Sequence, residues 1–111
     1  MAVLVKNPKE TRIQQVGARG ITEAVLAGPG SGCNRFTVRR IKLAVEGRTS
    51  RTSPDLGIVY FIQSGKVALS HGEGDLDHLS EGDTAVIHPE EKHHLQNLHS
   101  SFSTVLAVVP Q

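Results

Sequence analysis

The fold of this chain is decided by residues 82–97, which read GDTAVIHPEEKHHLQN. A Gly-Asp turn releases the apolar strand 84–87, and a second strand begins at His93 after a turn that contains a proline. Side chains alternate between the two faces of a strand, so His93, Leu95 and Asn97 share one face. The stretch therefore predicts two strands of a sheet, with a histidine and an asparagine along one wall.

The remaining apolar segments fit the same architecture. Strands are expected at 21–26, 36–45, 58–62, 66–71, 76–79 and 102–109, with glycine-containing turns between most of them. Their spacing of roughly 8–12 residues is typical of an all-β barrel or sandwich, and no window has helical periodicity.

Three details of this pattern are specific expectations. Ala2 to Val5 is a candidate edge strand, and Glu46-Gly47 is expected to end the strand 36–45. The segment 58–62 is apolar at every position, which predicts that both of its faces are covered.

Length and composition narrow the class of protein. The chain has 111 residues, which predicts one domain, with 1–20 as an N-terminal extension or edge strand and 21–111 as the barrel. The formal net charge is +1, no long basic run exists, and only one Tyr and three Phe are present. Nucleic-acid binding needs a basic stripe or stacking aromatic side chains, so the sequence argues against that partner.

The cellular compartment is predicted from the cysteine count and the hydropathy pattern. Cys33 is the single cysteine, which excludes an intramolecular disulfide and suits a reducing environment. The first ten residues lack the features of a signal peptide, and no apolar stretch approaches the ~20 residues of a membrane span. The expectation is a cytoplasmic protein with no membrane partner.

Residues 82–97 resemble the second sequence motif of the cupin superfamily, G-x5-P-x-G-x2-H-x3-N. Gly82, His93 and Asn97 stand at the family spacing, whereas His88 and Glu90 replace the motif's Pro and second Gly. The resemblance implies a small cupin-type β-barrel, a jelly-roll-like double sheet. It also implies that His93 occupies the position of a metal-binding histidine.

The first cupin motif, G-x5-H-x-H-x3/4-E-x6-G, departs from the family pattern. Counted back from Gly65, its Glu position falls on Ile58, and its two His positions fall near Arg51 and Ser53. Counted forward from Gly47, the two His positions fall near Ser53 and Asp55. Three of four expected ligands are therefore missing. A divalent transition metal (Zn, Ni, Mn or Fe) held by His93 and His88 and a metal-free pocket both stay open, since three or four convergent ligands are the norm.

Two hypotheses of function follow from the resemblance. In the first, the barrel binds a small polar metabolite as an isomerase, cyclase, lyase or oxygenase, with His93 as the general acid/base or as a metal ligand. In the second, the barrel is a non-catalytic module that binds or senses a small molecule. A purely structural role is a third option.

The ligand-binding candidates come from the positions that the two motifs place at the lumen. They are Arg51, Ser53, Asp55, Tyr60 and Asn97. Tyr60 and Asn97 also have structural interpretations, as a core ring and as a hydrogen-bonding residue before a turn.

Cupins commonly dimerise through sheet faces, so the resemblance implies a homodimer. Val59 and Phe61 are the candidates for its apolar face.

Overall fold

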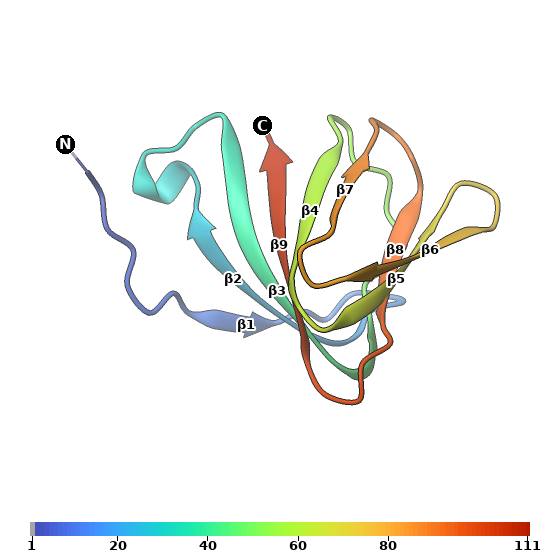
Figure 1. Cartoon of the computed structure of the whole chain (residues 1–111). Coiled ribbons are helices and arrows are strands. Elements are labelled where there is room, and N and C mark those ends of the chain that lie inside the picture. Colours follow the sequence, from blue (N-terminus) through green and yellow to red (C-terminus); the bar gives the residue numbers. More distant parts are fainter. Residues whose placement is uncertain (1) are drawn as a thin grey trace.

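The computed structural model describes residues 2–111 and consists almost entirely of antiparallel strands (Figure 1). The strands are β1 (Glu10–Arg12), β2 (Arg19–Ala27), β3 (Phe36–Arg48), β4 (Ile58–Ser64), β5 (Lys66–His71), β6 (Asp75–Ser80), β7 (Thr84–Ile87), β8 (His93–Asn97) and β9 (Ser103–Pro110). The helical content described is one 3₁₀ turn, Pro29–Ser31. The all-β expectation is confirmed.

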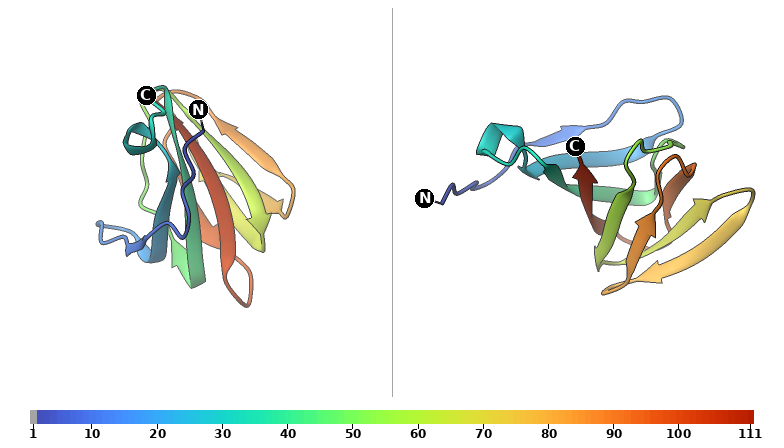
Figure 2. Two further views of the ribbon diagram at one scale, coloured as in Figure 1. Left: turned by 90° about the vertical axis from the view of Figure 1, so that its left-hand side faces the viewer. Right: turned by 90° about the horizontal axis from the view of Figure 1, so that it is seen from above.

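The strands form one strongly curved sheet that folds back on itself. Its order is β6-β5-β8-β3-β9-β4-β7, with β2 pairing to β3 and β1 pairing to β2. Two layers face each other in consequence, one built around β3, β9 and β4 and the other around β8, β5 and β6 (Figure 2). The two strands at the ends of this order, β6 and β7, do not pair with each other. The barrel is therefore nearly, but not fully, closed. This is the double-sheet barrel that the sequence predicted.

The longest strand, β3, connects the two layers because it bends near its end. Its first part pairs with β2 and β9, and its last residue, Arg48, pairs with Gln96 of β8. The expectation that Glu46-Gly47 ends this strand is wrong. Glu46 adopts a positive φ of 60°, and a Cβ at Gly47 would lie 2.8 Å from the carbonyl oxygen of Ala44, so the pair forms a bend within the strand.

The core lies between the two layers and consists of inward residues of every long strand. Leu43, Ile62, Val67, Leu95 and Val105 are fully buried. On β4 only alternate residues are buried, so the expectation that both of its faces are covered is wrong for the single chain. Val59 and Phe61 are 36% and 40% exposed, so no segment within residues 2–111 covers the outer face of β4.

The N-terminal segment differs from the expectation as well. Ala2 to Val5 is not a strand; the edge strand is β1, which pairs antiparallel with β2 from Glu10↔Ala24 to Arg12↔Thr22. Three salt-bridge contacts hold these edge strands against β3, including a 2.8 Å contact between Lys42 and Glu10. Across residues 2–111, no helix is long and apolar enough to span a membrane.

Asn97 fixes the position of β8 against the bend of β3. Its side-chain Nδ2 lies 3.1 Å from the carbonyl oxygen of Leu43, 2.9 Å from that of Ala44 and 2.8 Å from that of Ser101. Its Oδ1 accepts hydrogen bonds from the Ser103 hydroxyl at 2.6 Å and the His99 backbone N–H at 2.9 Å. One buried amide therefore joins β8, β3 and the turn into β9.

Replacing Asn97 with Ala is expected to destabilise the protein by about 2–4 kcal/mol, because it leaves buried carbonyl groups without donors. Chemical denaturation measures the change in the free energy of unfolding. Gln96→Ala, one position earlier on the exposed face of β8, is the matched control and is expected to change stability by less than about 0.5 kcal/mol. Equal effects of the two substitutions would contradict the assigned role of Asn97.

Candidate functional site

The candidate site is a cavity of about 190 Å³ in the barrel lumen. β2, β3, β4 and β9 form its apolar wall, with the inward residues Ile21, Ile41, Ile58, Ala107 and Val109. Polar groups line the cavity as well: Glu23, Arg39 and Tyr60 come from β2, β3 and β4, and Gln15, Thr49, Ser50 and Thr52 come from the connecting segments. An apolar cavity with a few convergent polar groups is the usual form of a small-molecule site.

A hydrogen bond between Tyr60 and His93 forms the most buried polar feature beside this cavity. The Tyr60 hydroxyl lies 2.7 Å from His93 Nε2, and His93 Nδ1 lies 3.2 Å from the carbonyl oxygen of Glu91. A carbonyl can only accept, so Nδ1 carries the hydrogen and donates it to Glu91. Nε2 of the neutral ring therefore accepts the hydrogen bond that the Tyr60 hydroxyl donates.

Burial keeps both members of this pair uncharged. It lowers the pKa of His93, because the imidazolium form loses hydration, and the carbonyl of Glu91 offsets this only in part. Burial also raises the pKa of Tyr60 well above its usual value, and the nearby carboxylate of Glu23 raises it further. At neutral pH the pair is a phenol and a neutral imidazole.

A charged pair lies on the same sheet as Tyr60, on β2 and β3. Arg39 Nη1 lies 2.9 Å from Glu23 Oε1, and both side chains line the cavity. Arg39 Nε is buried and, within residues 2–111, has no hydrogen-bond partner. Across the sheet Arg39 pairs with Ala107, and Ala107 pairs with Tyr60. The small side chain of Ala107 thus leaves space between the guanidinium and the phenol.

Glu23 and Arg39 are two cavity residues that were not predicted from the sequence. The signal for Arg39 was present, because alternation on 36–45 places it on the same face as Ile41 and Leu43, which are core residues. Glu23 alternates in the same way with the buried Ile21. A charged residue on the buried face of a strand is the pattern that identifies both.

The structure brings only some of the predicted residues together. Tyr60 lines the cavity, whereas His93 is 1% exposed and lies behind the cavity wall, in contact with Tyr60. Asn97 is buried with its amide bonded to protein groups.

The three loop candidates lie elsewhere. Arg51, Ser53 and Asp55 are exposed, and none of them lines the lumen cavity. Arg51 instead donates a hydrogen bond to the carbonyl oxygen of Gly72 at 2.8 Å.

The residues present do not fit a metal ion. Within the described residues, no group of three or more His, Cys, Asp or Glu side chains is placed to hold one. Both ring nitrogens of His93 have protein partners. His88, the other candidate ligand, is exposed and lines a separate groove with Asp77 and Glu91. A metal needs three or four convergent donors. Among the described residues, the cavity has the carboxylate of Glu23, which is paired with Arg39, and His93 behind its wall, which is too few.

The chain was compared with protein-family models, curated proteins and solved structures. No protein-family model matches the chain, and no curated protein matches it. Among solved structures, the polyketide cyclase RemF from Streptomyces resistomycificus has a TM-score of 0.90 at 19% identity, covering 99% of this chain and 80% of that one.

Two further structures extend the comparison. A predicted oxalate decarboxylase from Thermotoga maritima has a TM-score of 0.83 at 21% identity, covering 97% of this chain and 96% of that one. An RmlC-like cupin from Shewanella frigidimarina has a TM-score of 0.76 at 12% identity, covering 94% and 84%. At these identities the likeness concerns the fold.

Acidification is expected to destabilise the fold through His93. The folded pKa lies below the ~6.5 of an exposed histidine, so the unfolded chain takes up this proton first as the pH falls. The contribution of His93 is thus fully present above about pH 6.5 and is lost as the pH falls from there through the folded pKa. Urea unfolding between about pH 7.5 and about pH 5 measures the slope.

His93→Gln is expected to flatten this slope relative to the wild type. The matched control is His99→Gln, at an exposed histidine. An unchanged slope in His93→Gln would show that His93 is not held neutral by burial.

Proposed function

We propose, from the premise that this chain has the cupin fold, that it binds a small organic molecule in the barrel lumen and removes a proton from it. The observation that carries the proposal is the hydrogen bond from Tyr60 to the buried His93, at the wall of the lumen cavity. A positioned acid–base pair beside an apolar cavity is the usual equipment for proton transfer.

The pair acts as a base relay in this proposal. Tyr60 donates its hydrogen to His93, so the lone pairs of its oxygen are the groups available to a ligand. When the ligand transfers a proton to the Tyr60 oxygen, the hydroxyl hydrogen moves to His93 Nε2. The imidazolium that forms keeps its Nδ1–H bond to the carbonyl of Glu91. Neither Tyr60 nor His93 is charged before this step, so the buried pair carries no unpaired charge in its resting state.

Arg39 stabilises the anion that such a step produces. Removal of a proton leaves negative charge on the ligand, and the guanidinium of Arg39, whose side chain is 41% exposed, is a positive charge at the cavity that can stabilise it. Arg39 is oriented for this by Glu23 and has a buried Nε without a partner among the described residues. Glu23 is thus a positioning residue, and no step involves a metal.

The cavity favours a ligand with an apolar body and one carbonyl group. Its volume of about 190 Å³ is close to that of engineered apolar cavities of about 150 Å³ that accept benzene. A carbonyl placed near Arg39 would acidify the adjacent C–H bond and direct it towards Tyr60. An isomerase, cyclase or lyase reaction can begin with that proton transfer.

The second candidate function is binding without turnover. It is favoured by the 2.9 Å salt bridge between Arg39 and Glu23, which already neutralises the cation of the cavity. A lumen with no net charge and a neutral Tyr60–His93 pair can hold a ligand without reacting with it.

Acetophenone distinguishes these functions, because it has an apolar ring and a weakly acidic methyl group beside a carbonyl. The wild type is expected to accelerate hydrogen–deuterium exchange of this methyl group in D₂O, as followed by proton NMR. Tyr60→Phe is expected to lower the rate by about 10²–10⁴-fold, the usual contribution of a general base, while binding is retained.

Two substitutions to leucine on β9 test whether binding and exchange take place in the lumen cavity. Ala107→Leu is expected to abolish both binding and exchange, since Ala107 lines the cavity, whereas Val108→Leu on the outer face of β9 leaves both unchanged. Binding without exchange would support the non-catalytic function. Failure of acetophenone and related ketones to perturb the lumen residues would contradict the proposed site.

We also propose that the chain forms a homodimer through the outer face of β4 and β7. Val59 pairs across strands with Val86 and Val108, and Phe61 pairs with Leu106, so apolar side chains adjoin on one outer surface. Val86 is 60% exposed and Phe61 40%. A partner subunit that covers them would remove this apolar surface from water.

Sedimentation is expected to show a dimer of the wild type at micromolar concentration. Phe61→Glu is expected to give a monomer, because it places a charge in the buried centre of the interface. Leu76→Glu, an exposed apolar position on β6, is the control and is expected to stay dimeric. A monomeric wild type would overturn the proposal.

The compartment is a further part of the proposal. Cys33 is a free, half-buried thiol in the structure. We infer a cytoplasmic location, since a free thiol is kept reduced there.

A further inference from the structure

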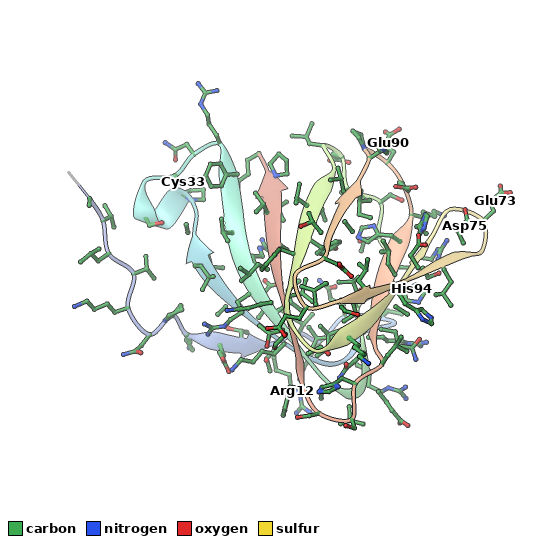
Figure 3. The ribbon with its side chains drawn as sticks, viewed as in Figure 1. Arg12, Cys33, Glu73, Asp75, Glu90 and His94 are labelled. Atoms are coloured by element: carbon green, nitrogen blue, oxygen red, sulfur yellow. The ribbon has the colours of Figure 1, made fainter. Side chains whose placement is uncertain are left out.

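A second cavity lies on the outer side of the loop that follows β3. Its volume is about 180 Å³, and it is lined by Arg48, Arg51, His94, Thr49 and Gly17. His94 and Gln96 alternate with the buried His93, Leu95 and Asn97, so this site is on the opposite face of β8 from the lumen. Figure 3 shows His94 on the side of the molecule formed by β5, β6 and β8.

The two arginines are held in place without neutralisation. Arg48 Nε donates to the carbonyl oxygen of Gly17 at 3.0 Å, and Arg51 Nη2 donates to that of Gly72 at 2.8 Å. Within residues 2–111, neither guanidinium forms a salt bridge. The backbone bonds order both side chains and leave most of their N–H groups free.

The surroundings of His94 are consistently positive. Burial lowers the pKa of His94, and the charges of Arg51 and Arg48, which line the same cavity, lower it further. No acidic side chain in the described part of the chain offsets these positive charges at His94. Figure 3 shows Glu73 and Asp75 in the β5–β6 hairpin, away from His94. Like charges that share a cavity repel one another, and a bound anion removes that cost.

The loop that carries these groups is fixed by the barrel. The Thr49 backbone N–H donates to the carbonyl oxygen of Leu95, and the Thr49 hydroxyl accepts from the Leu95 N–H, both at 2.9 Å. The Ser50 hydroxyl donates to the carbonyl oxygen of Val16 at 2.8 Å. Because this loop is already ordered, binding of a ligand does not incur the conformational-entropy cost of ordering it.

We propose that Arg48, Arg51 and His94 form a binding site for a phosphate group, separate from the lumen. Two guanidinium groups and an imidazole offer three sets of donors. A tetrahedral phosphate can present three oxygens to them, whereas a carboxylate has two oxygens, which one guanidinium already satisfies. The site is independent of the proton transfer proposed for Tyr60.

Inorganic phosphate is the probe that tests this site. In a titration followed by two-dimensional NMR at constant ionic strength, saturable shifts are expected at His94 and Arg51, which do not line the lumen cavity, together with a rise in the pKa of His94. Arg48→Gln and Arg51→Gln are each expected to weaken binding at least about tenfold, since a hydrogen bond to a charged group is lost. Arg48→Lys, which keeps the charge but loses the planar fork, is expected to restore part of it.

Arg12→Gln, an exposed arginine on β1, controls for a general loss of positive charge. The proposal is overturned if Arg12→Gln weakens binding as much as Arg48→Gln, if acetate binds as tightly as phosphate, or if no saturable shift occurs in the folded wild type. Methyl phosphate in a parallel titration separates the sources of the group: tighter binding than inorganic phosphate indicates a phosphate ester, and weaker binding indicates the free ion.

Discussion

The hydrogen bond from Tyr60 to His93 crosses the interior and joins the two layers of the barrel. Tyr60 comes from β4 in one layer and His93 from β8 in the other, and both are almost fully buried. A buried imidazole without partners would be costly, so the phenol and the carbonyl of Glu91 together determine its tautomer and orientation, while burial keeps the ring neutral. The chemistry of the lumen depends on that arrangement.

The same arrangement explains why the metal interpretation does not fit this chain. His93 stands where the resemblance places a metal ligand, yet its ring nitrogens are both bonded to protein groups. Ile58, at the expected Glu position, contributes an apolar surface to the cavity wall. Arg39 and Glu23 place a paired charge at the same cavity.

The sequence predicted the strands well, because alternation and turn chemistry are local. The strand 84–87 and the inward face of His93, Leu95 and Asn97 were obtained correctly. The bend at Glu46-Gly47 was not, since a strand end and a bend within a strand have the same local sequence and only the pairing with β8 distinguishes them. The contacts between site residues could not be predicted from the sequence either, because Tyr60 and His93 are 33 residues apart in the chain and only the tertiary fold brings them together.

The state of the His93 ring is the most direct test of this account. Long-range ¹H–¹⁵N NMR of the wild type at neutral pH reports which ring nitrogen carries the hydrogen, and repeating it with added Zn²⁺ reports coordination. The account predicts a neutral ring protonated at Nδ1, unchanged by zinc. A ring protonated at Nε2, or one whose nitrogen signals shift with stoichiometric zinc, would contradict it.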